Sequence, residues 1–252
     1  MLRKDLRKTL NISDTHLKNK KINEIKPISS QFMKQLTNLI AYVIHYKALT
    51  ERKEFLLKQF DKNSLDYYFI ENYDRNTLTE EDKKLFKVKF PSFHKAITLS
   101  HIDAYRRTLK SDYKYNLILE DDVVFDEDFS DKLAEGLEQL PEDYDMLFIG
   151  TCFNFHIPQK RIKPSQFIYE KCREPTGWGG NGATRCTDSY LVSKKGSQKV
   201  IDYISQLEDH QIDKPVDWWL NQVIRDLKLK IYWMEPTIVR QGSEKGDYDK
   251  SH

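Results

Sequence analysis

The stretch Asn116–Val124, NLILEDDVV, decides how this chain folds. An apolar run ends there in three consecutive carboxylates, and apolar residues resume directly after them. Such a run is typical of a buried parallel strand, and open α/β sheets bind their ligands at the carboxyl ends of these strands. Adjacent acids repel one another and lose hydration beside a buried strand, so a cation is their natural partner. Because Mg²⁺ and Mn²⁺ prefer oxygen ligands, the stretch predicts a metal–nucleotide site.

Further apolar runs alternate with helical patterns on both sides of this stretch, which predicts one α/β domain over residues 39–252. The expected strands are Leu39–Ile44, Tyr67–Ile70, Leu117–Leu119, Met146–Ile149, Ser189–Val192 and Lys230–Met234. The expected helices are Ala48–Phe60, Glu80–Phe86, Ser100–Lys110 with Ser100 as N-cap, Phe129–Leu140, Ser197–Leu207 and Val216–Asp226. Residues 153–187 carry most of the loop signals, and the glycine-rich loop Gly177–Gly182 has the composition of one that closes over a ligand.

The composition is that of an ordinary globular protein, with 32% charged residues and a formal net charge of +2. Residues 1–38 are rich in Lys and Asn, and we interpret them as a basic arm or short helices, either ordered or mobile. The alternatives for its role are a solvated extension and contact with an anionic membrane or polyanion. No signal peptide and no apolar run of about 20 residues is present, so we expect no integral membrane segment. The three cysteines form no CxxC pair, which predicts neither a disulfide framework nor a zinc site and favours a reducing, cytoplasmic location.

Several blocks in order resemble glycosyltransferase family 25, which includes lipooligosaccharide and procollagen galactosyltransferases. The strongest pair is Ser100-His101-Ile102 followed by the strand and acids of Leu117–Phe125. The other matching blocks are Tyr42–Ile44 with Glu51-Arg52, Asp188–Gly196 and Pro215-Val216-Asp217. The resemblance spans roughly residues 40–240, and the Lys- and Asn-rich style is also similar to that of collagen-modifying members from giant viruses. His45 departs from the pattern, since members usually have a small polar residue after the first strand.

The resemblance implies a GT-A-like (Rossmann-type) fold, with a mixed, mostly parallel sheet flanked by helices. It further implies transfer of a hexose, galactose or glucose, from a UDP-sugar to a hydroxyl group with Mn²⁺ or Mg²⁺ as cofactor. The acceptor would be a glycan or the hydroxylysine of a collagen-like protein, and the sequence does not separate the two. If the protein is viral, its location would be the host cytoplasm. We expect no nucleic-acid partner, and the oligomeric state is not readable from the sequence.

The spacing of the three acids at 120–122 predicts which of them binds the metal and which contacts the donor. Glu120 and Asp122 are two residues apart, so in an extended chain their side chains point the same way, with Asp121 opposite. Asp122 is then the expected direct metal ligand, with Glu120 or Asp121 contacting a metal-bound water or the ribose. His252 is a candidate for the third ligand, as C-terminal histidines are in related folds. The alternative is an acid-rich helix start favoured by the helix dipole.

Inversion at the sugar carbon, implied by the resemblance, requires a carboxylate that takes the acceptor's proton. Asp217 is our first candidate for this base and Asp188 the second, while a capping acid at a helix start is the alternative for Asp217. The remaining candidates for donor binding are Ile44, His45, Arg52, His101 and Trp178. Arg52 would pair with the diphosphate unless it is a surface residue, and His101 would otherwise be structural. Of Trp218 and Trp219, neighbours on a helix, at least one is expected in the core.

Two other functions remain open on this sequence. A metal-dependent phosphohydrolase or nuclease would also cluster acids, but it needs further acids or histidines at other strand ends. A catalytically inactive carbohydrate-binding protein could keep the same fold. The presence of both Asp122 and Asp217 argues against such a loss of activity.

Overall fold

The central sheet places the predicted strands side by side. The computed structural model describes residues 36–151, 155–177 and 182–245. Seven strands pair in the order β2-β1-β3-β7-β5-β8-β6, and β6 and β7 run opposite to the other five. Their bounds are β1 Leu39–Ile44, β2 Asp66–Ile70, β3 Tyr115–Glu120, β5 Met146–Phe148, β6 Ile168–Lys171, β7 Ser189–Val192 and β8 Ile231–Met234. The expected mixed, mostly parallel, GT-A-like sheet is therefore confirmed.

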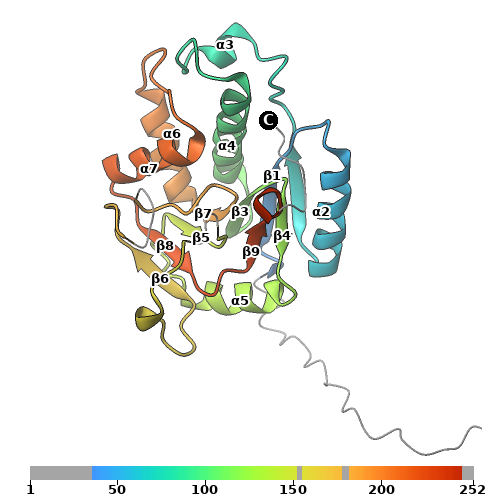
Figure 1. Cartoon of the computed structure of the whole chain (residues 1–252), viewed down its shortest axis with the longest axis vertical. Coiled ribbons are helices and arrows are strands. Elements are labelled where there is room, and N and C mark those ends of the chain that lie inside the picture. The colour runs from blue at the N-terminus through green and yellow to red at the C-terminus, as the bar shows by residue number, and fades with distance from the viewer. Residues whose placement is uncertain (1–35, 152–154, 178–181, 246–252) are drawn as a thin grey trace, which may run out of the picture.

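Helices cover both faces of this sheet, as Figure 1 shows. Their bounds are α2 Thr50–Asn63, α3 Glu80–Lys83, α4 Ser92–Lys110, α5 Phe129–Gln139, α6 Lys194–Ser205, α7 Val216–Asp226 and α8 Gly242–Lys245, with a 3₁₀ turn η2 at Gln159–Arg161. Side chains of a strand point alternately to its two faces. In β1, Tyr42 and Ile44 accordingly pack with α4, α6 and α7 in one core cluster, whereas Ala41 and Val43 pack with α2 and α5 in another.

A small second sheet closes the acidic end of β3. Strand β4, Val123–Phe125, pairs antiparallel with β9, Val239–Gln241. The backbone N–H of Gly242 then donates to the carbonyl of Asp122 over 2.7 Å. A segment more than a hundred residues later in the chain is thus fixed beside the carboxylates, because β9 continues directly into Gly242 and Ser243.

Three predictions about elements were wrong. Helix α4 begins at Ser92 after the extended Pro91, so Ser100 is not an N-cap; its hydroxyl instead donates to the Ala96 carbonyl within the helix. Helix α6 begins at Lys194 rather than Ser197, because the Ser193 side chain accepts a hydrogen bond from the backbone of Gly196 and caps it. Strand β6 lies inside the stretch that was expected to be loop, and β4 and β9 were not expected.

The cysteines also differ from expectation. Cys172 is a free, exposed thiol, whereas Cys186 is disulfide-bonded. Most of the proposed basic arm lies outside the described residues too, although Leu36 at its end is buried. Within the described ranges, no helix has the length and apolar character that crossing a bilayer requires.

Candidate active site

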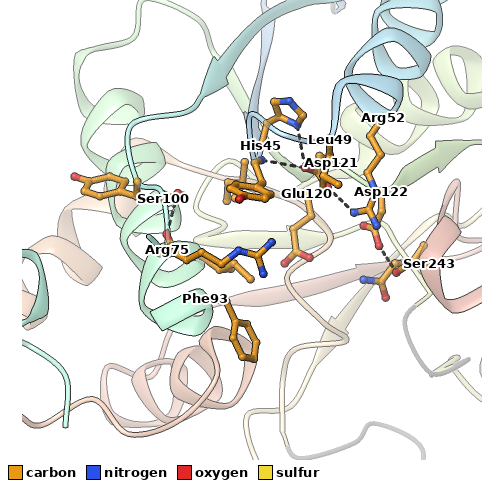
Figure 2. Close-up of a pocket in the computed structure, with 16 residues that line it drawn as sticks. His45, Leu49, Arg52, Arg75, Phe93, Ser100, Glu120, Asp121, Asp122 and Ser243 are labelled. Carbon is orange, nitrogen blue, oxygen red and sulfur yellow. Dashed lines mark hydrogen bonds and ion pairs between the residues drawn. The ribbon is translucent and has the colours of Figure 1, made fainter. Parts of the chain in front are cut away.

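A cavity of about 310 Å³ lies at the carboxyl ends of β1 and β3 (Figure 2). The acids of residues 120–122 form one side of it, while Leu49, Phe93 and Ile97 give it apolar surface. Apolar walls with a few convergent polar groups are typical of small-molecule sites. Of the residues predicted from the sequence, six line this cavity: Ile44, His45, Arg52, Glu120, Asp121 and Asp122.

Asp121 is held entirely by groups of the protein. Its Oδ1 accepts a hydrogen bond from Arg52 Nη1 at 2.8 Å, and its Oδ2 lies 2.9 Å from His45 Nδ1 and 3.1 Å from the Tyr46 backbone nitrogen. Burial by itself raises the pKa of Asp121, but the hydrogen bonds from His45 and Arg52 outweigh burial and lower it. The carboxylate therefore stays ionised and ties the end of β1 and the start of α2 to the acidic turn.

Asp122 keeps one oxygen open. Its Oδ2 accepts a hydrogen bond from the Ser243 hydroxyl, and its Oδ1 is buried with no hydrogen-bond partner among the described residues. Burial, followed by the nearby charge of Glu120, raises the pKa of Asp122 to about 6. A buried carboxylate with an open oxygen and a raised pKa lacks a positive partner, and a bound cation would supply one.

Glu120 and Asp188 complete a group of mutually repelling acids. Glu120 Oε1 accepts from Thr187 Oγ1 at 2.9 Å, and burial raises the pKa of Glu120 to about 7. Asp188 accepts from Ser189 Oγ at 2.8 Å through Oδ2, while its Oδ1 is buried and no described residue forms a hydrogen bond with it. Burial, with added repulsion from Glu120 and Asp122, raises the pKa of Asp188 to about 7. In the described part of the chain, no three side chains of metal-ligating type are grouped to hold an ion.

Asp217 lies in the first turn of α7, within electrostatic reach of His101 and Glu120. Burial is the main cause that raises its pKa, which makes it a stronger base than an exposed carboxylate. Trp219 is buried in the core, whereas Trp218 is 52% exposed, so the expectation that at least one of the pair belongs to the core is confirmed. Trp178 and His252 lie outside the described residues, and their predicted roles stay predictions.

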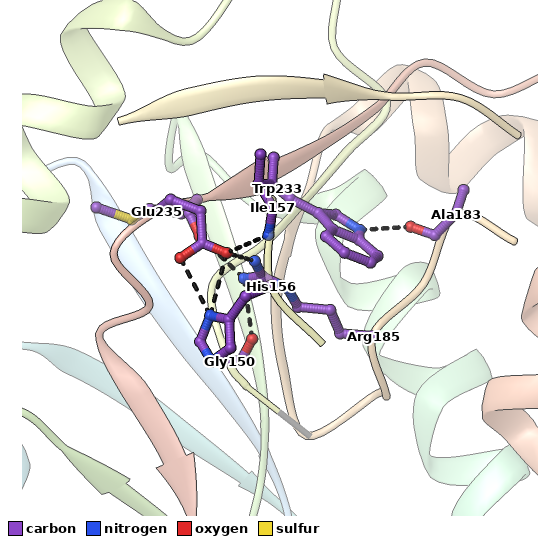
Figure 3. Close-up of polar contacts among 8 residues, drawn as sticks. Gly150, His156, Ile157, Ala183, Arg185, Trp233 and Glu235 are labelled. Carbon is purple, nitrogen blue, oxygen red and sulfur yellow. Dashed lines mark hydrogen bonds and ion pairs between the residues drawn. The ribbon is translucent and has the colours of Figure 1, made fainter. Parts of the chain in front are cut away.

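A buried ion pair between Arg185 and Glu235 lies at the ends of β5 and β8 (Figure 3). Arg185 Nη2 donates to Glu235, and Arg185 Nη1 donates to the carbonyls of Gly150 at 3.1 Å and Met234 at 2.9 Å. The guanidinium also lies 4.5 Å from the ring centroid of Trp233. One side chain thus connects the ends of β5 and β8 with the segment that leads to Asp188.

Sequence reasoning missed several residues of the site. They are Arg75, Thr187, Arg185, Tyr190, Glu235 and Ser243. Arg75 stacks over Tyr46, with its guanidinium 4.3 Å from the ring centroid, and extends into the cavity in Figure 2. None of these residues belongs to the acidic stretch, and Tyr190 alone lies in a predicted strand. Only an apolar strand following Asp188 marked the region of Thr187 and Tyr190 as close to the site.

A mixed α/β sheet with acids and a cavity at the carboxyl ends of its strands places this chain among the α/β proteins that bind their ligands at that edge. A family model described as Glycosyltransferase family 25 (LPS biosynthesis protein) matches residues 38–219. The chain belongs to this family, as the blocks around His101 and Glu120 predicted.

Three relatives illustrate the range of this family. A candidate glycosyltransferase of Acanthamoeba polyphaga mimivirus, R655, is 32% identical over 47% of this chain and 39% of its own length. The lipooligosaccharide biosynthesis protein lic2B of Haemophilus influenzae is 25% identical over 69% of this chain and 66% of its own. Procollagen galactosyltransferase 2 of Homo sapiens is 20% identical over 64% of this chain. The chain thus spans from 27% to 66% of the length of these curated relatives.

Among solved structures, a glycosyltransferase involved in the glycosylation of the major capsid of PBCV-1 matches 81% of this chain and 93% of its own, with a TM-score of 0.48 and 9% identity. A likeness of this degree carries no argument about activity.

Proposed function

We propose that this chain transfers a hexose, galactose or glucose, from a UDP-sugar to a hydroxyl group of an acceptor, with Mn²⁺ or Mg²⁺. Membership of the family supports glycosyl transfer. The observation that carries the finer proposal is the open, buried Oδ1 of Asp122 at the wall of a cavity large enough for a nucleotide. A bare carboxylate of this kind beside a nucleotide-sized cavity is what a metal–diphosphate complex needs.

The residues present fit a divalent cation with an incomplete protein shell. Asp122 would bind it directly, with Glu120 or Asp188 as the second carboxylate, because each lies within electrostatic reach of Asp122. Mg²⁺ is commonly held by one or two carboxylates while water and substrate phosphates fill its other positions, so a group of three side chains is not required. When bound, such a cation neutralises the negative charge that develops on a departing diphosphate.

The chain's own side chains account for donor binding in this proposal. Leu49, Phe93 and Ile97 offer apolar surface to the base and ribose, and Tyr46 with Arg75 adds a flat ring and a positive charge. Arg52 Nη1 donates a hydrogen bond to Asp121 at 2.8 Å. In the proposal Arg52 therefore acts at the cavity as part of this ion pair and not as a separate phosphate ligand. Ser243 and Thr187 hold Asp122 and Glu120 in place.

Asp217 acts as the base. The acceptor oxygen forms its bond to the anomeric carbon on the face opposite the diphosphate, while the bond from that carbon to the diphosphate oxygen breaks. Asp217 takes the proton released by the acceptor hydroxyl, and its raised pKa suits this task. Asp188 is the second candidate for the base, although its full burial under Gly150 favours a role toward the cation.

The acceptor is a hydroxyl group of a glycan or of hydroxylysine in a collagen-like protein. The names of two relatives support these alternatives, since one belongs to lipooligosaccharide biosynthesis and the other is a procollagen galactosyltransferase. Trp218, exposed beside Asp217, offers a flat apolar surface at which an acceptor sugar could stack.

A UDP-release assay tests the proposal. Release is measured over a panel of UDP-sugars with Mn²⁺, Mg²⁺ or EDTA, for the wild type, for Asp122→Ala and for Glu127→Ala. Glu127 is a matched control because it is an exposed acid in the same acidic stretch and does not line the cavity. We expect release from one donor that is lost in EDTA and in Asp122→Ala and is kept in Glu127→Ala.

Absence of release from every donor, together with no cation-dependent UDP binding by calorimetry, would contradict the proposal. UDP binding without turnover would instead favour the inactive carbohydrate-binding alternative. Cleavage of a general phosphodiester substrate would favour the phosphohydrolase.

A further inference from the structure

Three buried side chains form a hydrogen-bonded row behind Glu120. His101 and Tyr105 lie one turn apart on α4, and Tyr190 lies on β7 opposite them. The Tyr105 and Tyr190 hydroxyl oxygens are 2.8 Å apart, and the Tyr190 hydroxyl is 2.9 Å from His101 Nδ1. All three residues have no solvent exposure. The three side chains are therefore shielded from bulk solvent.

Ring stacking fixes the place of the central hydroxyl. The Tyr190 ring lies 5.9 Å from the His101 ring at an angle of 15° between their planes, and Phe148 stacks on Tyr190 at 5.2 Å. Tyr190 therefore cannot turn its hydroxyl away from His101 without disrupting the core between α4 and the sheet. Burial raises the pKa of both tyrosines, so both hydroxyls keep their protons and remain donors.

The other nitrogen of His101 faces the acids. His101 Nε2 is buried, has no hydrogen-bond partner within the described residues, and lies 3.5 Å from Glu120 Oε1. His101 is fully buried, which disfavours its charged form, so the ring is neutral and carries a single proton. Where Glu120 is ionised, a bare Nε2 would direct its lone pair at a carboxylate oxygen in a site of low dielectric, whereas Nε2–H would donate to it. The second arrangement is electrostatically favoured.

We infer that Tyr105 and Tyr190 hold His101 in the tautomer that carries its proton on Nε2, directed at Glu120. In this arrangement Tyr105 donates to Tyr190, Tyr190 donates to His101 Nδ1, and His101 donates to Glu120. Every hydrogen in the row points toward the acidic group. Thr187 and His101 then share Glu120 Oε1, which leaves Oε2 of Glu120 for the donor or for a cation-bound water.

Tyr190 is accordingly a positioning residue, because it acts on Glu120 through His101. In this structure His101 Nε2 lies 3.5 Å from Glu120 Oε1 without forming a hydrogen bond, and such contacts often tighten when substrate closes the site. The contribution to sugar transfer rests on the proposed function, whereas the tautomer of His101 does not. The two are therefore tested by separate measurements.

Nitrogen-15 NMR reads the tautomer directly. The protein is labelled with ¹⁵N at its seven histidines and studied without metal, at a pH above the raised pKa of Glu120, and the His101 signals are assigned by their loss in His101→Gln. We expect the wild type to show a protonated Nε2 and an unprotonated Nδ1 at His101. Tyr190→Phe removes only the hydroxyl that donates to Nδ1, so we expect it to move the population toward the Nδ1-protonated form.

Tyr105→Phe is the matched control, since it removes a buried hydroxyl from the same row but leaves the Tyr190 donor. We expect it to keep the wild-type tautomer. Thermal melting of all variants shows whether a change reflects loss of fold. A protonated Nδ1 in the wild type, or an unchanged tautomer in folded Tyr190→Phe, would overturn the inference while leaving the proposed function intact.

Turnover provides the second readout, once the donor is known. In Tyr190→Phe we expect the kcat to fall about 10-fold with the donor KM within about twofold, as is common when a supporting hydrogen bond of a site is removed. A merely structural loss would instead lower the fraction of active protein and leave the kcat of the folded fraction unchanged. An unchanged kcat with an altered tautomer would overturn the positioning role.

Discussion

At the scale of single residues, the contrast between Asp121 and Asp122 is the clearest feature of the site. The first uses both of its oxygens inside the protein, and the second keeps one buried oxygen open. Their directions follow from the alternation of side chains, which the sequence analysis used to separate Glu120 and Asp122 from Asp121. The partners that give each acid its role, His45, Arg52 and Ser243, were beyond that reasoning because they come from distant segments.

Substitution of these two neighbours should have opposite effects. Asp121→Ala removes the carboxylate that pairs with the buried Arg52, and we expect it to lower the free energy of unfolding by about 3–5 kcal/mol. Asp122→Asn removes one of several repelling charges, so the metal-free protein should be at least as stable as the wild type. Urea unfolding in EDTA and in Mg²⁺ measures both, and Asp122→Asn should also lose any stabilisation by Mg²⁺. A large loss of stability for Asp122→Asn in EDTA would contradict this division of roles.

Asp217 should affect turnover rather than donor binding. We expect Asp217→Asn to lower the kcat by roughly 10²-fold or more while the affinity for the donor is little changed, since a general base contributes about that much. Asp213→Asn is the matched control, because Asp213 is a nearby acid paired with Lys87 on the surface. Steady-state kinetics with donor and acceptor varied separately give the answer. An equal effect of both variants would rule out Asp217 as the base.

At the scale of elements, long apolar runs were predictable and short paired segments were not. Strands β1, β5, β7 and β8 lie within one residue of their expected bounds, because buried strands carry a continuous local pattern. Strands β4 and β9 have three residues each and exist through pairing across more than a hundred residues, for which no local signal exists. Helix α4 begins before its expected start at Ser100. A serine that looks like an N-cap in the sequence can also lie inside a helix and donate to the preceding turn, as Ser100 does.

The junction of β5 with α6 depends on a close backbone approach. A Cβ on Gly196 would lie 2.5 Å from the carbonyl oxygen of Asp145, which also accepts the backbone N–H of Ser193. We expect Gly196→Ala to lower the free energy of unfolding by about 1–3 kcal/mol through overpacking. Gly177→Ala is the control, since nothing lies within 4 Å of a Cβ there. Chemical denaturation compares the two, and equal stabilities would show that the backbone relaxes freely at this junction.

At the scale of the whole molecule, the fold gathers acids that oppose one another in its centre. The pKa of Glu120 and of Asp188 is raised to about 7, and that of Asp122 to about 6. In the unfolded chain these groups titrate near roughly 4. The folded protein therefore binds more protons between these limits, and its stability should increase as the pH falls through about 7 toward about 4. His101 opposes this trend, because its lowered pKa favours the unfolded state below about 6.5.

The raised pKa values of the three acids should outweigh the lowered pKa of His101. The net result is then a gain in stability as the pH falls. We expect the metal-free protein to unfold at a higher temperature at pH 5.5 than at pH 8. Saturating Mg²⁺ should reverse this order, since a cation binds the deprotonated carboxylates and competes with protons. Thermal melting at the two pH values, with EDTA or Mg²⁺, checks both statements. A melting temperature in EDTA that falls from pH 8 to pH 5.5 would mean that the acids do not repel one another as described.

The pairing of β4 with β9 sets an order of events during protein synthesis. Asp122 depends on Gly242 and Ser243 for two of its hydrogen bonds, and these residues leave the ribosome about 120 residues after it. Most of the large sheet can assemble before they emerge. The acidic centre is therefore completed after most of the large sheet, and a chain stopped before residue 239 would present its carboxylates without their supports.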